Sequence, residues 1–228
     1  MSTKVSVLVA VWNSARYFRE ALESALAQTR KAHEIIVVDD GSSDESASIA
    51  ESYPEVRCMR EVHRGVAPTR NTALTHVTGD LVAWLDADDV WTSDKLEVQA
   101  GFMDAHPEIG MTFTHQRLVF EAGVERPYWV REEMIGADSP VVGTCSMMAR
   151  AHLFPQIGDF DETKTPADDS DWIFRAKQVG VGYLTLPETL LIRRVHAENL
   201  STVKPMGRPQ VLGLLRASIN RKRTGPTS

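Results

Sequence analysis

The segments Val5-Ser-Val-Leu-Val-Ala-Val11 and Glu34-Ile-Ile-Val-Val-Asp39 decide the fold class of this chain. Both are short, rich in β-branched residues and almost continuously apolar, which is typical of strands buried on both faces of a parallel sheet. The stretch between them predicts a helix that begins after Ser14 and ends at Gln28-Thr29, because four apolar residues recur there at helical spacing: Phe18, Leu22, Ala25 and Leu26. Together these elements predict a strand–helix–strand unit.

The alternation of strands and helices continues along the chain. Patterning and turn residues predict helices over residues 44–52, 68–77, 93–106 and 170–179, and strands over residues 56–60, 81–85, 111–119 and 141–149. Such alternation predicts an α/β fold with a mostly parallel central sheet flanked by helices, whose ligands bind at the carboxyl ends of the strands. Residues 204–228 contain three prolines and predict a frayed tail with one short helix near residues 211–219.

The composition is that of an ordinary soluble protein. The 228 residues are 43% hydrophobic and 25% charged, which suits one sizeable core and excludes disordered, collagen-like and low-complexity chains. The apolar run 7–12 is far shorter than the roughly 20 residues that span a bilayer, and it lacks a signal-peptide pattern. We therefore expect a cytoplasmic chain. Cys58 and Cys145 are expected to be reduced core thiols, because no disulfide or zinc-ligand spacing accompanies them.

Charge is distributed unevenly along the chain. The net charge of −6 divides into −13 for residues 1–190 and +7 for residues 191–228. The acidic body is expected to repel nucleic acid, whereas the basic tail has the sign that attracts phosphate groups or anionic lipid headgroups. The tail carries basic residues (Arg216, Arg221, Lys222 and Arg223) beside apolar ones (Val211, Leu212, Leu214 and Leu215), which leaves open a peripheral contact with the inner face of a membrane or a solvated, disordered terminus.

Acidic residues directly follow two of the predicted strands. Asp39-Asp40 ends one strand, and Asp86-Ala-Asp88-Asp89 follows another. Because the carboxyl ends of strands face the ligand crevice, these five carboxylates are expected to converge and to repel one another unless a cation or hydrogen-bond donors neutralise them. Hard oxygen ligands suit Mg²⁺ or Mn²⁺. The alternative is that each group only caps the helix that follows it, since Asp-Gly-Ser-Ser is a good turn by itself.

The order and spacing of several motifs resemble those of the family 2 glycosyltransferases, which have the GT-A fold. The motifs, as they stand in this chain, are Val5 to Asn13, Val37-Val-Asp-Asp-Gly-Ser-Ser-Asp44, Gly65 with Arg70-Asn71, Gly79-Asp80, Leu85-Asp-Ala-Asp-Asp89, Asp168-Asp169-Ser-Asp171-Trp and Arg194-Val-His196. The resemblance spans nearly the whole chain. It implies one GT-A domain over residues 1–203, in which residues 1–90 bind donor and metal and residues 91–203 shape the acceptor site.

The resemblance implies that a sugar moves, with inversion at its anomeric carbon, from a nucleoside-diphosphate sugar to an acceptor hydroxyl. UDP-linked sugars are the commonest donors of such enzymes. A divalent cation, Mn²⁺ or Mg²⁺, would stabilise the leaving diphosphate as a Lewis acid, and the implied ligands are Asp88 and His196. Asp40 corresponds to the residue that accepts a nucleobase N–H. The other donor-binding residues that the resemblance implies are Val9, Val11, Asn13, Arg70, Asp86 and Ala87.

Direct displacement by an alcohol also needs a general base, because an alcohol is a poor nucleophile at neutral pH. The resemblance implies Asp169 in this role, at the start of a helix beside the acceptor site. Acids at a helix N-terminus also interact favourably with the helix dipole, so capping is the alternative role of Asp169. The family usually carries Glu-Asp where this chain has Asp168-Asp169, which leaves the choice between these two open.

The expected partners are a nucleotide-sugar donor and an acceptor that is a saccharide, a lipid-linked saccharide or a protein. The small residues of Gly143-Thr-Cys-Ser146 resemble the segment that lines the acceptor pocket in the family, and they suit a tightly packed strand equally well. Trp12, Trp84 and Trp91 are expected to pack in the core or against loops. Two other functions stay open: a Mg²⁺-dependent phosphatase with Asp86 as nucleophile, and a non-catalytic nucleotide-sugar-binding protein.

Overall fold

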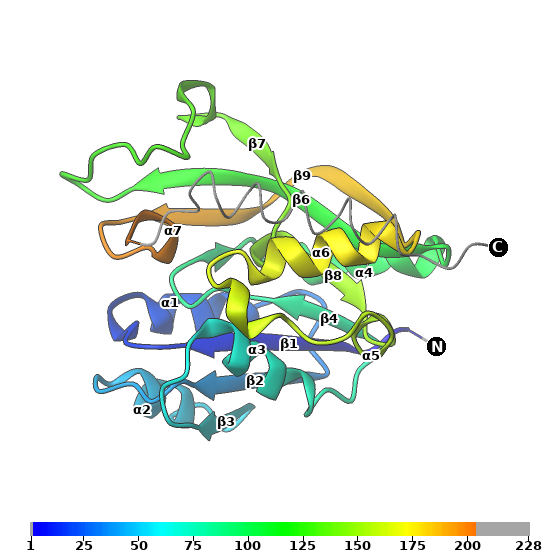
Figure 1. The fold of residues 1–228 in the computed structure, drawn as a ribbon, viewed down its shortest axis with the longest axis horizontal. Coiled ribbons are helices and arrows are strands. Elements are labelled where there is room, and N and C mark those ends of the chain that lie inside the picture. The colour runs from blue at the N-terminus through cyan, green and yellow to red at the C-terminus, as the bar shows by residue number, and fades with distance from the viewer. Residues whose placement is uncertain (1, 204–228) are drawn as a thin grey trace.

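Figure 1 shows the computed structural model, which describes residues 2–203 of the chain. The predicted tail helix and its membrane contact lie outside this range. Within it, nine strands form one sheet in the order β3-β2-β1-β4-β8-β6-β9-β5, and β7 also pairs with β6. The strands are β1 (Val5–Val11), β2 (Glu34–Asp39), β3 (Val56–Arg60), β4 (Leu81–Trp84), β5 (Val90–Trp91), β6 (Ile109–Phe120), β7 (Asp138–Val141), β8 (Met148–Arg150) and β9 (Gly182–Val195).

Helices cover this sheet and connect its strands (Figure 1). The α-helices are α1 (Ala15–Leu26), α2 (Ser46–Glu51), α3 (Val66–Leu74), α4 (Lys95–Ala105), α5 (Leu153–Ile157), α6 (Asp168–Gln178) and α7 (Leu200–Val203). The 3-10 turns are η1 (Glu132–Met134), η2 (Thr144–Ser146) and η3 (Glu162–Lys164). α6 begins two residues before its predicted start, so both Asp168 and Asp169 lie in its first turn.

The predicted strand–helix–strand unit is confirmed. β1 pairs in parallel with β2 and with β4, and β2 pairs in parallel with β3. α1 follows Ser14 and buries Phe18 and Leu22 in the core. Because β1 lies between β2 and β4, the acids that follow β2 and those that follow β4 lie on either side of the end of β1.

The second half of the sheet is mixed. β8 is antiparallel to both β4 and β6, whereas β9 runs parallel to β6. The prediction of one strand over residues 141–149 is wrong, because the N–H groups of Ser146 and Met147 bond back to the Gly143 carbonyl and form η2. The sequence pattern did not predict β9, whose pairing with β6 shifts register near His115 and whose run of residues contains Pro187.

The core consists of two apolar layers, one on each face of the sheet. Alternate residues of a strand point to opposite faces. Accordingly, Val7 and Val9 pack in the layer that contains α1 and α4, whereas Leu8 packs in the layer that contains α3, α5 and α6. Trp84 and Trp91 are buried, as expected. Trp12 is exposed, because β1 ends just before it and the chain turns there.

Two further expectations concern thiols and membrane spans. Cys58 and Cys145 are both free thiols, and Cys145 is buried, as expected for a core thiol. Residues 2–203 contain no helix with the length and hydropathy of a membrane span.

Candidate active site

Asp40 is buried at the end of β2 and holds the loop that leads into α3. Its Oδ1 accepts the Arg64 N–H at 2.7 Å, and its Oδ2 accepts the Gly65 N–H at 2.8 Å. His63 Nδ1 lies 2.9 Å from Oδ2, and the His63 ring stacks on Trp12 with 4.4 Å between ring centroids. Trp12 is 50% exposed, so a half-exposed aromatic pair stands beside Asp40.

The other predicted donor-site residues near β1 offer different groups to a ligand. Asn13 has a positive φ of 46°, and its Oδ1 accepts the Ser43 N–H at 2.8 Å, which ties the turn after β1 to the turn after β2. The side chains of Val9, Val11 and Ala87 are buried in the core layer that contains α1. A ligand would therefore contact only the backbone of these three residues.

The segment after β9 folds back onto Asp88. Oδ2 of Asp88 lies 3.0 Å from His196 Nε2 and accepts a hydrogen bond from Asn199 Nδ2 at 2.9 Å. His196 Nδ1 accepts the Glu198 N–H, so Nε2 carries the ring proton and donates it to Asp88. Burial opposes ionisation of Asp88, but the hydrogen bonds from His196 and Asn199 lower the pKa of Asp88 below its ordinary value. Asp88 is therefore held as an oriented anion.

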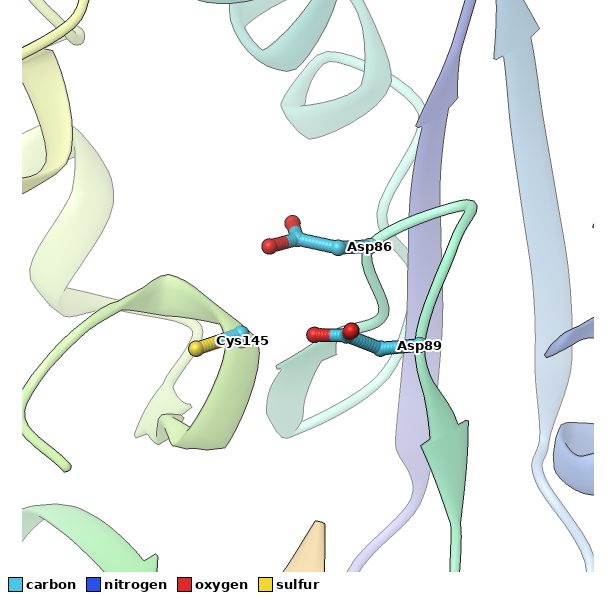
Figure 2. Close-up of side chains that lie close together, drawn as sticks. All are labelled: Asp86, Asp89 and Cys145. Carbon is cyan, nitrogen blue, oxygen red and sulfur yellow. The ribbon is translucent and has the colours of Figure 1, made fainter. Parts of the chain in front are cut away.

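Asp86 and Asp89 lie together beside Cys145. One atom from each of these side chains lies within 4.8 Å of the others, and Figure 2 shows both carboxylates extending toward the thiol. Burial raises the pKa of Asp86, and it raises that of Asp89 further. Burial also raises the pKa of the Cys145 thiol, which stays neutral. Without a bound cation, burial therefore favours the neutral forms of these three side chains.

These acids fit a hard divalent cation. Asp86, Asp88 and Asp89 belong to one short turn. The pKa values of Asp86 and Asp89 are raised because burial outweighs the nearby guanidinium groups, so their charges are compensated only in part. A bound cation would supply further compensation, and carboxylate oxygens are the ligands that Mg²⁺ and Mn²⁺ prefer. The neutral thiol of Cys145 is a poor ligand for such ions.

The first turn of α6 places its two acids in different surroundings. Asp168 is 1% exposed, and its Oδ2 lies 2.7 Å from Arg70 Nη1. Asp169 is less buried, and its Oδ1 accepts the Ser170 N–H at 2.5 Å. A Cβ added to Gly143 would lie 3.5 Å from Asp169 Oδ2, so this second oxygen faces the segment that enters η2.

The segment around Gly143 connects Asp169 to the acids after β4. The same added Cβ would lie 3.7 Å from Cys145 Sγ, and Cys145 lies in the cluster with Asp86 and Asp89. The structure therefore brings Asp86, Asp89 and Asp169 together around one segment, with Asp88 in the same turn. Asp40 lies on the other side of the end of β1.

Three residues near these acids were not predicted. Asn199 bonds Asp88, as described above. The guanidinium of Arg193 lies 4.6 Å from the centroid of the Trp129 ring. Burial opposes the charge of Arg193, but the carboxylates of Asp89, Asp86 and Asp88 raise its pKa. The third is Lys95. The positions of Arg193 and Asn199 depend on β9 and on the turn after it, and no sequence pattern predicted either.

Lys95 is a buried cation at the start of α4 that supports η2. Its Nζ donates to Gln99 Oε1 at 2.6 Å and to the Ser146 carbonyl at 3.2 Å, and it lies 5.2 Å from the centroid of the Trp91 ring. No carboxylate pairs with it among residues 2–203. Burial lowers the pKa of Lys95 to about 7.

Lys95 is expected to make the free energy of unfolding rise with pH above 7. Its pKa is about 7 when folded and about 10.4 when unfolded, so between these values the unfolded chain binds the additional proton. The slope contributed is about 1.4 kcal/mol per pH unit. Urea denaturation from pH 6.5 to 9.5 should show this slope in the unaltered protein and its loss in Lys95→Met. Lys31→Met, at an exposed site, controls for the change in net charge; parallel curves for Lys95→Met and the unaltered protein would contradict the prediction.

Solved structures with the same fold are glycosyltransferases. Residues 1–349 of Staphylococcus aureus TarS, in complex with UDP-GlcNAc, match with a TM-score of 0.78 and 21% identity, over 99% of this chain and 68% of that one. The mannosyltransferase PcManGT from Pyrobaculum calidifontis, in complex with GDP-Man and Mn²⁺, matches with a TM-score of 0.71 and 21% identity, over 100% of this chain and 66% of that one. The curled sheet with acids at its strand ends thus places the chain in the GT-A class.

The sequence comparisons define the family. Residues 6–139 match the family model of glycosyl transferase family 2, and the chain belongs to this family. An uncharacterised glycosyltransferase of Rickettsia prowazekii is 32% identical over 208 residues, which cover 86% of this chain and 65% of the relative. The uncharacterised glycosyltransferase YibD of Escherichia coli is 40% identical over 92 residues, or 39% of this chain and 27% of the relative. The chain thus spans less than two thirds of either relative.

Proposed function

We propose that this chain transfers a sugar from a nucleoside-diphosphate sugar to an acceptor hydroxyl, with inversion at the anomeric carbon. One observation carries the proposal. Asp169 Oδ2 and the acids after β4 approach the Gly143–Cys145 segment together, so a carboxylate and a candidate cation site border the same space. Inverting displacement requires these two functions on opposite sides of the reacting carbon.

The donor is proposed to bind to residues 1–90. Asp40 and the Trp12–His63 pair border the end of β1 and offer a carboxylate and an aromatic face to a nucleobase. Asn13 and the backbone of Val9 and Val11 lie along the same strand end. A UDP-linked sugar is the donor that we propose first.

A divalent cation, Mn²⁺ or Mg²⁺, would neutralise the charge that develops on the leaving diphosphate. Asp88 is the proposed principal ligand, because it is held ionised and its Oδ1 has no bond to His196 or Asn199. Asp86 and Ala87 precede Asp88 in the chain and border the proposed cation site. His196 is proposed to complete the site, either by orienting Asp88, as its present hydrogen bond does, or as a ligand through Nε2 in the other tautomer, in which Nδ1 carries the ring proton.

Asp169 is the proposed general base. In the displacement, the acceptor oxygen forms a bond to the anomeric carbon, and the bond from that carbon to the diphosphate oxygen breaks. Asp169 Oδ2 takes the acceptor proton, and the leaving diphosphate keeps the bonding electron pair. Asp169 Oδ1 is already bonded to the Ser170 N–H, which fixes the carboxylate and leaves Oδ2 toward Gly143.

Residues 91–203 are proposed to shape the acceptor site, and the acceptor is proposed to be a saccharide, free or lipid-linked. Gly143 leaves space in front of Asp169 that a side chain would occupy, since an added Cβ would lie 3.5 Å from its Oδ2. An acceptor hydroxyl needs that space in order to reach the base.

A thermal-shift panel of nucleotide sugars, with and without Mn²⁺, tests the proposed function. A ligand that binds only the folded state raises the Tm, by an amount that grows with its concentration over Kd. We expect one UDP-linked sugar to raise the Tm in the presence of Mn²⁺ and much less in its absence, with release of UDP when saccharide acceptors are added. The absence of any shift, or turnover of a generic phosphate ester in place of the sugar nucleotide, would reject the proposal.

A further inference from the structure

Of the two acids at the start of α6, Asp168 forms an ion pair with Arg70 and Asp169 does not. Arg70 comes from α3, in the first half of the chain, and its Nη1 lies 2.7 Å from Asp168 Oδ2. Its Nη2 lies 3.7 Å from Asp86 Oδ1. One guanidinium therefore approaches both the helix that carries Asp169 and the turn that carries the candidate metal ligands.

The Arg70–Asp168 pair is isolated from solvent. Asp168 is 1% exposed and Arg70 is 8% exposed, and the guanidinium lies 5.9 Å from the ring of Trp84 and 5.7 Å from that of Phe160. Asp168 Oδ1 is buried and has no hydrogen-bond partner within residues 2–203. The charge of Asp168 is thus balanced by Arg70 alone, and a buried pair of this kind strongly favours one geometry.

A second contact between α3 and the segment before α6 reinforces the pair. Asn71, which follows Arg70 in the chain, accepts the Phe160 N–H at 2.9 Å and donates to the Phe160 carbonyl at 3.0 Å. The Trp172 indole of α6 donates to the Gly158 carbonyl of the same segment. Two consecutive residues of α3 therefore set the position at which α6 begins.

We propose that Asp168 is a positioning residue rather than the general base, and that its ion pair with Arg70 holds Asp169 at the proper distance from the Asp86–Asp89 turn. This inference rests on the proposed function, because it assigns the roles of two acids in the same reaction. Asp168 does not face the Gly143 segment, whereas Asp169 does. A shift of α6 by about 1 Å would move the base out of line and reduce turnover by about 10²-fold.

The test compares Asp168→Asn with Asp168→Glu, and uses Asp171→Asn as the matched control. Asp171 lies on the same helix, is equally buried at 1% exposure and forms ion pairs with Lys164 and Arg175, whereas the ion-pair partner of Asp168 is Arg70. All variants are assayed for Mn²⁺-dependent transfer from UDP-linked sugars to a panel of p-nitrophenyl glycosides. Circular dichroism and thermal melting measure how far each variant stays folded.

We expect Asp168→Asn to lower kcat by about 10²-fold with the donor KM within about threefold, because the base is displaced while the donor site is kept. Asp168→Glu keeps the charge and is expected to recover most of the lost turnover. Asp171→Asn is expected to lower the Tm without changing kcat. Unchanged kcat in Asp168→Asn, or an equal loss in Asp171→Asn, would overturn the inference.

Hydrogen exchange separates this inference from the proposed function. In Asp168→Asn, the amides of the first turn of α6 are expected to exchange faster, while the rest of the helix keeps its protection. If Asp169→Asn kept its transfer activity, the proposed base would be wrong, whereas faster exchange in Asp168→Asn would still show that the ion pair with Arg70 holds the first turn of α6 in place. If Asp169→Asn were inactive and Asp168→Asn were unaffected in both readouts, only the positioning role would fail.

Discussion

Asp169→Asn is expected to lower kcat by about 10²- to 10⁴-fold while donor affinity stays within about threefold of the unaltered protein. The carboxamide keeps the size of the side chain and an oxygen that accepts the Ser170 N–H, so α6 is not disturbed. What it lacks is a group that takes a proton at neutral pH. The loss is expected to fall on the chemical step, because the hydrogen bonds that Asp169 forms among residues 2–203 are with Ser170 and not with the residues proposed to bind the nucleobase.

Donor affinity and turnover are to be measured on the same protein preparation. Isothermal titration with the nucleotide sugar and Mn²⁺ gives the affinity, and product formation under saturating donor gives kcat. Asp171→Asn, which removes a carboxylate that forms ion pairs with Lys164 and Arg175, is the control for substitution of a buried acid on this helix. Residual turnover above about a tenth of the unaltered rate would place the base elsewhere.

Asp88→Ala is expected to remove the Mn²⁺-dependent part of donor binding and to lower kcat/KM by about 10³-fold or more. The substitution deletes the ionised carboxylate that His196 and Asn199 orient, and no other acid of this turn has a lowered pKa. Asp86 and Asp89 stay behind with raised pKa values, so they compensate poorly for the lost ligand.

Mn²⁺ titrations of donor-induced Tm shifts check this result. In the unaltered protein, the donor-induced Tm shift should grow with Mn²⁺ concentration and saturate. In the Asp88→Ala variant, the Tm shift should be small and independent of Mn²⁺. Asp94→Asn is a suitable control, because Asp94 is an exposed acid a few residues further along the same segment. An unchanged Mn²⁺ dependence in Asp88→Ala would show that the ion binds through other residues.

The N-terminal half of the fold was predictable because its signals are local. β1 and β2 are near-continuous apolar strands, and α1 has an apolar stripe at helical spacing, so each element is specified by residues close together in the chain. The same signals failed at residues 141–149, where η2 interrupts the strand pattern.

The sequence predicts the acids of the candidate site but not their hydrogen-bond partners. Acids that directly follow a buried strand lie at the carboxyl edge of the sheet, so the sequence alone predicts the positions of Asp40, Asp86 and Asp88. Their hydrogen-bond partners come from distant segments. Asn199 and Arg193 reach the turn after β4 only because β9 returns beside β5 and β6, a pairing that spans most of the second half of the chain.

The sequence alone determined the class of fold, the strand ends that carry acids and the helix that begins near Asp169, since each depends on a pattern within a few residues. Only the tertiary structure decided which acid is paired and which faces the site. Asp168 and Asp169 are identical and adjacent, so no local pattern distinguishes them. Arg70 makes the difference, because a buried guanidinium from another helix binds one carboxylate at 2.7 Å and leaves the other beside Gly143.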